Sequence, residues 1–206
     1  MDNIVILVNG EFPTHSIPKS ILLKSDNIFC CDGAINKLDE IGVMPRKIIG
    51  DMDSINVSLK IKYAGKIIQL DRQSDTDLEK TLKYCIENEY KNIIILGFSG
   101  NRDDHFLSNI FLCWNYSEQM NIKMYSNFGE LSFVNGYKKY ESFIGEQISI
   151  YSNNQNNKIT TNGLKYHFNE ESLSNMYSGS SNESINNTFS IETTDGSVMI
   201  YKLFKG

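Results

Sequence analysis

The sequence has no long apolar run, no paired cysteines and no excess of positive charge. None of its apolar stretches approaches the roughly 18 residues that a membrane-spanning helix requires, so we expect no membrane partner. Its beginning, Met1 to Asn3 followed by a short apolar run, lacks the basic segment and the long apolar core of a signal peptide. These absences predict a soluble, cytoplasmic protein.

Cysteine is scarce and scattered. Cys30, Cys31, Cys85 and Cys113 form no CxxC pair, which argues against a zinc site. A chain of 206 residues can bury a core of its own and does not need a disulfide framework. We therefore expect four reduced thiols in the core.

Positive charge is outnumbered, with 20 Lys and Arg against 25 Asp and Glu and a formal net charge of -5. The phosphates of a nucleic acid would repel such a chain, so we expect no nucleic-acid partner. A small anion that arrives with a metal ion is still compatible with this charge. Hydrophobic residues make up 40% of the chain, enough to form one large domain or two small ones.

Short apolar runs alternate with helical patterns over the first 125 residues. Continuous apolar runs are typical of strands that are covered on both faces. Apolar residues recur at helical spacing over residues 76–88 and 104–117. This alternation predicts an α/β fold with a doubly wound, mostly parallel sheet. The predicted strands are Ile4–Val8, Ile28–Cys31, Lys47–Gly50, Lys66–Leu70, Ile93–Leu96 and Ile122–Tyr125.

The pattern changes after about residue 126. Segments such as 146–151 and 197–201 alternate apolar and polar residues, and polar clusters separate them. This pattern is typical of antiparallel β-structure. We therefore predict an α/β domain over residues 1–125 and an antiparallel β-sandwich domain over residues 126–206. The Asn-rich stretch 152–157 is interpreted as a hairpin turn.

Acidic residues follow several of the predicted strands. Asp32 follows the second strand, Asp51 and Asp53 follow the third, and Asp77 opens the helix after the fourth. Ligands of open α/β sheets bind beyond the carboxyl ends of the strands, so these side chains should converge. Two carboxylates about 4 Å apart repel by roughly 4 kcal/mol at an effective dielectric constant near 20. Oxygen ligands without His or Cys favour Mg²⁺ as the ion that relieves this repulsion.

Simpler interpretations compete for single residues. Asp is a common helix cap and loop residue, which suits Asp75 or Asp103 taken alone. An extended backbone between Asp51 and Asp53 would point both carboxylates to one side. Lys80, three residues after Asp77, forms either a surface ion pair of little worth or a cation that reaches phosphate. Its spacing does not decide between the two.

The segment Gly97–Arg102 has the features of a phosphate-binding turn. Its glycines let backbone N–H groups approach an anion at the start of a helix, and Arg102 can bind phosphate oxygens with two hydrogen bonds. The sequence contains no GxxxxGK[ST] loop. His105, taken alone, is more often a structural histidine than a catalytic one.

Five ordered motifs, with one further turn, resemble those of the thiamine pyrophosphokinase family. They span most of the chain: Asp32–Asn36, Gly50–Ser54, Gln73–Lys80, Gly97–His105 with Asn109, Gly163–Tyr166 and Ser181–Glu183. The chain departs from the family pattern at four positions, but none of them removes an acidic residue from the set Asp51, Asp53, Asp77 and Asp104. Asn101, in place of a glycine, tolerates the left-handed backbone that this position would need. The four departures are Ala34, Met52, Ser74 and Asn101.

The resemblance implies an enzyme that transfers the pyrophosphoryl group of ATP to the hydroxyl of thiamine, with Mg²⁺ as cofactor. It also implies a homodimer with active sites at the subunit interface, in which the first domain binds ATP and magnesium and the second binds thiamine. The implied metal ligands are Asp51, Asp53 and Asp77. The implied catalytic residues are these three with Lys80, Arg102 and Asp104. The implied ATP-binding residues are Asp32, Gly33, Gly50, Thr76, Ser99, Gly100, Asn101, Arg102, His105 and Asn109. The implied thiamine-binding residues are Gln73, Asp77, Ser181 and Asn182.

Two other functions remain open at this point. Asp51-Met52-Asp53 satisfies the DxD pattern of metal-dependent glycosyltransferases, a short pattern that also arises by chance. A nucleotide- or thiamine-binding module without turnover is the other alternative, and the departures at Ala34 and Asn101 are its only support.

Overall fold

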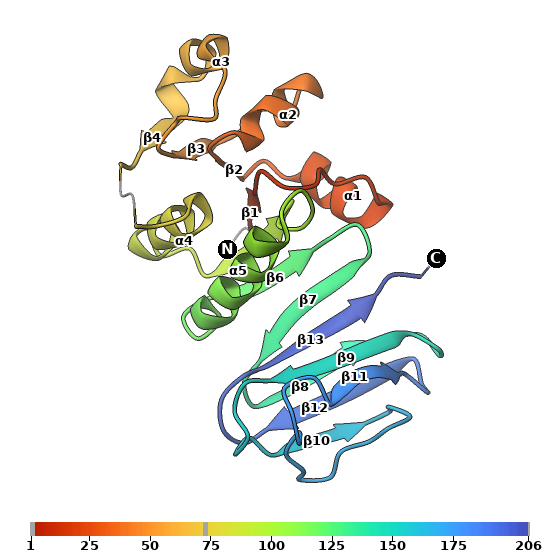
Figure 1. Cartoon of the computed structure of the whole chain (residues 1–206). Coiled ribbons are helices and arrows are strands. Elements are labelled where there is room, and N and C mark those ends of the chain that lie inside the picture. Colours follow the sequence, from red (N-terminus) through yellow and green to blue (C-terminus); the bar gives the residue numbers. More distant parts are fainter. Residues whose placement is uncertain (1–2, 72–73, 206) are drawn as a thin grey trace. The chain divides into compact units, whose positions relative to one another are not determined.

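The structure is a computed structural model that describes residues 3–71 and 74–205. It divides into two compact units, Met1–Asn127 and Phe128–Gly206. Figure 1 labels the helices and strands of both units.

The first unit is built on six parallel strands in the order β6-β5-β1-β2-β3-β4. The chain runs outward from the central strand β1 through β2, β3 and β4, and then returns to the other side of β1 for β5 and β6. The predicted α/β class is therefore confirmed, and the direction of winding reverses between β1 and β5. The strands are β1 (Ile4–Leu7), β2 (Ile28–Cys31), β3 (Lys47–Gly50), β4 (Ile67–Gln69), β5 (Asn92–Leu96) and β6 (Asn121–Tyr125).

The helices of this unit differ in how clearly the sequence predicts them. The two predicted helices are α4 (Asp77–Glu87) and α5 (Asp103–Tyr116). The Thr76 hydroxyl caps α4 by accepting a hydrogen bond from the Glu79 N–H at 3.2 Å, and Leu78 and Leu82 are buried beneath it. The helices without a sequence prediction are α1 (Ser16–Lys24), α2 (Ala34–Glu40), α3 (Val57–Lys62) and the 3-10 turn η1 (Ala64–Lys66).

The second unit is an antiparallel β-sandwich. One sheet has the order β11-β9-β13-β7 and the other β10-β12-β8. Apolar side chains from both sheets form a single core, among them Ile150, Ile200 and Phe189. The predicted sandwich is therefore confirmed. Its strands are β7 (Gly129–Val134), β8 (Tyr137–Glu141), β9 (Gln147–Ser152), β10 (Ile159–Asn162), β11 (Gly179–Glu183), β12 (Thr188–Thr193) and β13 (Val198–Leu203).

The Asn-rich stretch is not a hairpin turn, and that prediction is wrong. It connects β9 to β10, which belong to different sheets. Its last residue, Asn157, is buried. The Asn157 side chain accepts hydrogen bonds from the N–H groups of Thr194 and Asp195 and donates one to the Gly196 carbonyl at 3.1 Å. The asparagine therefore fixes the turn between β12 and β13.

Phe189 offers a test of the sandwich core. Its ring is buried and stacks on Tyr140, with the ring centroids 4.8 Å apart. We expect Phe189→Ala to lower the free energy of unfolding by about 3–5 kcal/mol, because it removes apolar contacts and leaves a cavity. Urea unfolding followed by fluorescence measures this loss. Ile144→Ala, at a side chain that is 69% exposed, should change stability by no more than about 0.5 kcal/mol, and a similar loss in both variants would contradict the prediction.

The four cysteines are free and buried. Burial raises the pKa of the Cys85 thiol to about 12, so this thiol stays protonated and unreactive at neutral pH. No helix in the described part of the chain has both the length and the apolar character needed to span a bilayer.

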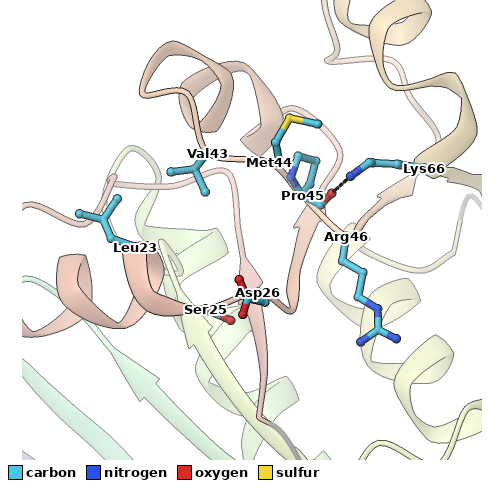
Figure 2. A pocket seen from close by; sticks show the side chains of 8 residues that line it. All are labelled: Leu23, Ser25, Asp26, Val43, Met44, Pro45, Arg46 and Lys66. Atoms are coloured by element: carbon cyan, nitrogen blue, oxygen red, sulfur yellow. Dashed lines mark hydrogen bonds between the residues drawn. The ribbon is translucent and has the colours of Figure 1, made fainter.

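A pocket of about 400 Å³ lies at the amino ends of β2 and β3, the edge opposite to the one where the acidic residues follow the strands. Figure 2 shows its lining, in which the Lys66 ammonium group donates a hydrogen bond to the Pro45 carbonyl at 2.6 Å. Apolar side chains such as Val43 and Met44 share the lining with the charged groups of Asp26 and Arg46. This pocket is remote from the candidate site described next.

Candidate active site

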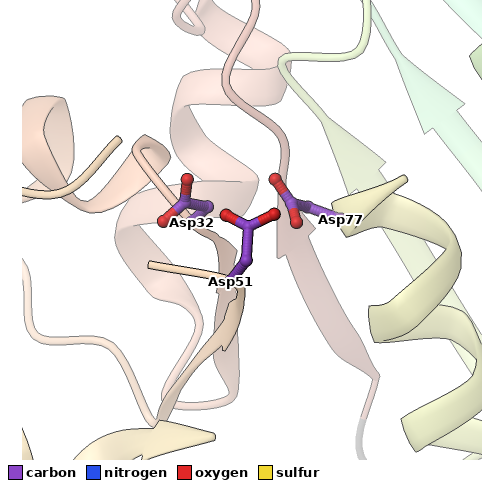
Figure 3. Close-up of side chains that lie close together, drawn as sticks. All are labelled: Asp32, Asp51 and Asp77. Atoms are coloured by element: carbon purple, nitrogen blue, oxygen red, sulfur yellow. The ribbon is translucent and has the colours of Figure 1, made fainter. Parts of the chain in front are cut away.

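Three aspartates meet at the carboxyl edge of the parallel sheet. Asp32 directly follows β2, Asp51 directly follows β3, and Asp77 is the first residue of α4. One carboxylate oxygen from each lies within 4.8 Å of the other two, and Figure 3 shows the three groups facing one another. We call these three residues the acidic triad.

Asp32 is the most deeply placed member of the triad, with a relative exposure of 3%. Its Oδ2 accepts a hydrogen bond from the Ser54 N–H at 3.0 Å. Its Oδ1 is buried and has no hydrogen-bond partner among the described residues. An unsatisfied buried oxygen of this kind costs about 1–3 kcal/mol. Three convergent carboxylates, one with an unused oxygen, therefore fit a hard divalent cation such as Mg²⁺.

Lys80 lies beside the triad and is 2% exposed. Its Nζ lies 3.1 Å from Asp51 Oδ2 and 3.1 Å from Asp77 Oδ1. The alternative of an exposed surface ion pair is therefore wrong. The charge-assisted hydrogen bond from Lys80 lowers the pKa of Asp51. Burial raises the pKa of Asp77, and the bond from Lys80 offsets this only in part.

Gly50 lies against two members of the triad. A Cβ atom at this position would lie 2.8 Å from the Cβ of Asp32 and 3.0 Å from Oδ1 of Asp77. Any side chain here would have to push these groups aside. The glycine therefore permits the close approach of the carboxylates.

The backbone from Asp51 to Asp53 is not extended, so the premise that pointed both carboxylates to one side is wrong. Met52 is buried and has φ 72, in the left-handed region. The chain turns there, and the Asp53 N–H donates a hydrogen bond to Asp51 Oδ1 at 3.3 Å. The Asp53 side chain is exposed and does not belong to the triad. Asp32, and not Asp53, is the third carboxylate beside Asp51 and Asp77. The DxD interpretation consequently gains no support from the geometry.

The predicted phosphate turn lies at the point where the winding reverses. The loop after β1 pairs with it, because the Gly10 N–H donates to the Gly97 carbonyl at 2.8 Å and the Glu11 N–H to the Ser99 carbonyl at 2.6 Å. Gly100 and Asn101 both have left-handed backbones, with φ 75 and φ 65. Asparagine is thus accommodated in the backbone geometry expected for this position.

Asn109 and Arg102 act on this turn in different ways. The buried Asn109 side chain, on α5, donates a hydrogen bond to the Phe98 carbonyl at 2.9 Å and so holds the turn in place. Arg102 is exposed and pairs with Asp104, with 3.0 Å between Nε and Oδ1. The Arg102 guanidinium lowers the pKa of Asp104 to about 2. His105 is exposed on the first turn of α5.

The remaining predicted residues of the first unit are placed as follows. Gly33 closely approaches its neighbours, since a Cβ there would lie 2.7 Å from Asn9 Nδ2 and 2.9 Å from the Cβ of Ser54. Thr76 serves as the cap of α4. Gln73 lies outside the described residues.

Comparison with known proteins identifies the family of both units. Residues 18–125 match the family described as thiamin pyrophosphokinase, catalytic domain, and residues 129–201 match thiamin pyrophosphokinase, substrate-binding domain. The chain belongs to the thiamin pyrophosphokinase family. This is a family of enzymes, as the resemblance of the sequence motifs implies.

Relatives of this family cover different shares of the chain. Thiamin pyrophosphokinase 1 of Caenorhabditis elegans is 32% identical over 124 residues, which are 52% of this chain and 48% of that protein. Thiamine pyrophosphokinase of Bacillus subtilis (strain 168) is 30% identical over 152 residues, which are 66% of this chain and 67% of that protein. The match therefore spans about half of the first relative. A crystal structure of thiamine pyrophosphokinase from Bacillus subtilis has the same fold, with a TM-score of 0.83, 20% identity and 100% coverage of both chains.

The family motifs of the second unit form a tight backbone arrangement. Ser181 and Asn182 lie in β11, where the pairing with β9 shifts register and Ser181 takes φ 60. The buried Asn182 side chain accepts a hydrogen bond from the Tyr166 N–H at 3.0 Å and donates one to the Tyr166 carbonyl. Residues 163–166 form no regular strand, and only Leu164 among them makes a β-bridge, to Ser184. Asn182 thus holds the exposed Tyr166 by its backbone.

The Asn182 contacts carry a prediction for stability. We expect Asn182→Ala to lower the free energy of unfolding by about 1–3 kcal/mol, because the N–H and the carbonyl of Tyr166 both lose their hydrogen-bond partner. Chemical denaturation measures the loss. Ser180→Ala, at an exposed position of the same strand, should be nearly neutral. Equal stability of the two variants would show that the hydrogen bonds between Asn182 and Tyr166 do not stabilise the protein.

The sequence predicted the roles of two residues, Asp32 and Lys37, only incompletely. Asp32 was expected to converge with Asp51, because both follow buried strands, but the family resemblance implied it as a nucleotide contact and not as a metal ligand. Lys37 donates a hydrogen bond to the Gly10 carbonyl at 3.2 Å. No signal in the sequence connects Lys37 with Gly10, because the contact joins helix α2 to the loop after β1.

Proposed function

We propose that this chain transfers the pyrophosphoryl group of ATP to the hydroxyl of thiamine, giving thiamine diphosphate and AMP. The acidic triad carries the proposal, because convergent carboxylates with an unused buried oxygen suit a cation that presents nucleotide phosphates. Membership in the thiamin pyrophosphokinase family supports the same reaction.

Asp51 and Asp77 are the proposed ligands of Mg²⁺, and the geometry favours Asp32 over Asp53 as the third. When bound, Mg²⁺ would neutralise charge on the phosphate oxygens. Asp77 is also the first candidate to accept the proton of the attacking hydroxyl, with Asp53 as the second. Asp77 is favoured over Asp53 because it lies in the triad, whereas the Asp53 side chain is exposed outside it.

The nucleotide contacts are proposed from the turn and the loops around it. Backbone N–H groups near Gly100 and Asn101 and the start of α5 suit phosphate oxygens. Arg102, now paired with an exposed Asp104, can exchange that partner for a phosphate at little cost, because exposed ion pairs are weak. Lys80 would offset charge on the transferred group. Gly33, Gly50, Thr76, Ser99, His105 and Asn109 complete the proposed ATP site.

The thiamine site and the dimer are proposals that rest on the family resemblance. Ser181 is exposed and available to a ligand, whereas Asn182 contributes by holding its surroundings. Gln73 and Asp77 are the proposed contacts from the first unit. We propose a homodimer with shared active sites, and the exposed rings of Tyr166 and Tyr177 offer apolar surface for such an interface. The cytoplasmic location stays a prediction.

One experiment tests the reaction directly. Purified protein is incubated with ATP, Mg²⁺ and thiamine, and the products are separated by chromatography. AMP and thiamine diphosphate in equal amounts are the expected result. Tight ATP binding without AMP would indicate a binding module instead, and sugar transfer from a nucleotide donor without AMP would indicate a glycosyltransferase.

A further inference from the structure

We propose that Lys80 couples the binding of the divalent cation to the binding of the nucleotide, because its ammonium group and the cation compete for two of the same carboxylates, Asp51 and Asp77. The inference rests on the proposed function, since it takes the acidic triad as the metal site. It gives Lys80 a role before any group is transferred.

The competition follows from the contacts of the ammonium group. Lys80 Nζ lies 3.1 Å from an oxygen of Asp51 and 3.1 Å from an oxygen of Asp77. These are two of the three residues whose oxygens lie within 4.8 Å of one another. A cation among the three would bind the same carboxylates and stand next to the ammonium group. Like charges at such a distance repel strongly away from water.

Asp32 shows why a cation is still attracted. Lys80 hydrogen-bonds to Asp51 and Asp77, whereas Oδ1 of Asp32 is buried and has no partner among the residues that the structure describes. One positive charge therefore faces three carboxylates. A cation that binds Oδ1 of Asp32 would satisfy this buried oxygen, which Lys80 does not contact.

The nucleotide supplies a new partner for the displaced lysine. A lysine side chain is a flexible stem that carries three donors on a compact charge, so its ammonium group can move from the carboxylates to a phosphate held by the cation. A cation that binds alone displaces the Lys80 ammonium group from its carboxylates and gives it no new partner. A cation that binds together with the nucleotide gives the ammonium group a phosphate as its new partner. The two ligands should therefore bind with positive coupling, and by linkage each should strengthen the other by the same factor.

Calorimetry on the full chain tests this inference. The affinity for Mg²⁺ is measured without nucleotide, and the affinity for ATP is measured with Mg²⁺ and with EDTA, always without thiamine. We expect Lys80→Met to bind Mg²⁺ alone about tenfold more tightly than the unaltered chain. The ATP affinity with Mg²⁺, divided by the ATP affinity with EDTA, should fall by about the same factor. Lys80→Arg, which keeps the charge, should not gain Mg²⁺ affinity.

Lys83 provides a matched control on the same helix. It pairs with Asp75 and Glu79 at 2.8 Å and 3.0 Å, outside the triad. Lys83→Met removes the same charge but should leave both the Mg²⁺ affinity and the coupling within about twofold, since neither Asp75 nor Glu79 belongs to the triad. An equal gain of Mg²⁺ affinity in both Met variants would mean that net charge alone is responsible, and would overturn the inference.

Stability gives a second measurement. Lys80→Met leaves Asp51 and Asp77 without their cationic partner, so its melting temperature should fall and should rise more on addition of Mg²⁺ than that of the unaltered chain. Lys80→Gln, which retains a neutral donor, should respond in the same direction. Lys80 variants that bind Mg²⁺ no more tightly and keep the full coupling would overturn the inference. Coupled binding without formation of thiamine diphosphate would instead contradict only the proposed reaction.

Discussion

Asp77→Asn is expected to reduce the rate of thiamine diphosphate formation by about 10²- to 10³-fold in single-turnover experiments. The change keeps the shape of the side chain but removes one of the three negative charges that converge at the sheet edge. It also removes an anionic partner of Lys80, and it abolishes the candidate acceptor of the hydroxyl proton. Because one residue serves both the cation and the lysine, the loss should exceed that of a single hydrogen bond.

A titration with Mg²⁺ separates the two parts of this effect. If Asp77 only holds the cation, high Mg²⁺ should restore much of the rate, whereas a loss that persists at saturation points to the proton acceptor. Asp39→Asn is a suitable control, because Asp39 pairs with Lys62 and Tyr63 away from the triad, and it should leave the rate within about twofold. A near-normal rate for Asp77→Asn would remove that residue from both roles.

The central strands β1 and β2 could be predicted from the sequence because they are apolar on both faces. Burial of every residue in β1 and β2 leaves a continuous apolar run as the signal. Helix α4 carries a clear helical repeat because one face, with Leu78, Leu82 and Cys85, is buried. The short helices carry no such signal. In α3, Val57 and Ile61 are 73% and 75% exposed, so its apolar residues do not mark a buried face.

The candidate site was predictable in outline and not in detail. Parallel strands end at one edge, so acids that follow them had to converge, and Asp32, Asp51 and Asp77 do so. The membership of Asp53 depended on one backbone angle, and the left-handed turn at Met52 reversed it. The local sequence contains no sign of that angle, since Met52 is not a residue type that favours the left-handed region. Burial of Lys80 was undecidable for a similar reason, since its second partner, Asp51, lies 29 residues away in the sequence.

Gly50 shows how the backbone itself sets the distance between the carboxylates. It is the last residue of β3 and directly precedes Asp51, and a Cβ atom on it would meet both Asp32 and Asp77. Residues on two different loops can bind one ion only if nothing occupies the space between them. The site therefore requires a residue without a side chain at position 50, in addition to its three acidic residues.

Gly50→Ala is accordingly expected to lower activity by about 10²-fold, because a displacement of about 1 Å in a catalytic group has effects of that size. The added Cβ would lie 2.8 Å from the Cβ of Asp32 and 3.0 Å from Oδ1 of Asp77, so both groups must move. Overpacking of this kind should also lower the free energy of unfolding by about 1–3 kcal/mol. Steady-state rates, Mg²⁺ affinity by calorimetry and urea unfolding measure the three consequences together.

Gly65→Ala is the matched control, since a Cβ at Gly65 meets nothing within 4 Å and its backbone is not left-handed. It should leave activity unchanged. The informative comparison is between activity and stability in Gly50→Ala. A folded variant with weakened Mg²⁺ binding and low activity places the damage in the spacing of the carboxylates. A folded Gly50→Ala that binds Mg²⁺ normally and retains more than half of the activity would show that this spacing does not limit the reaction.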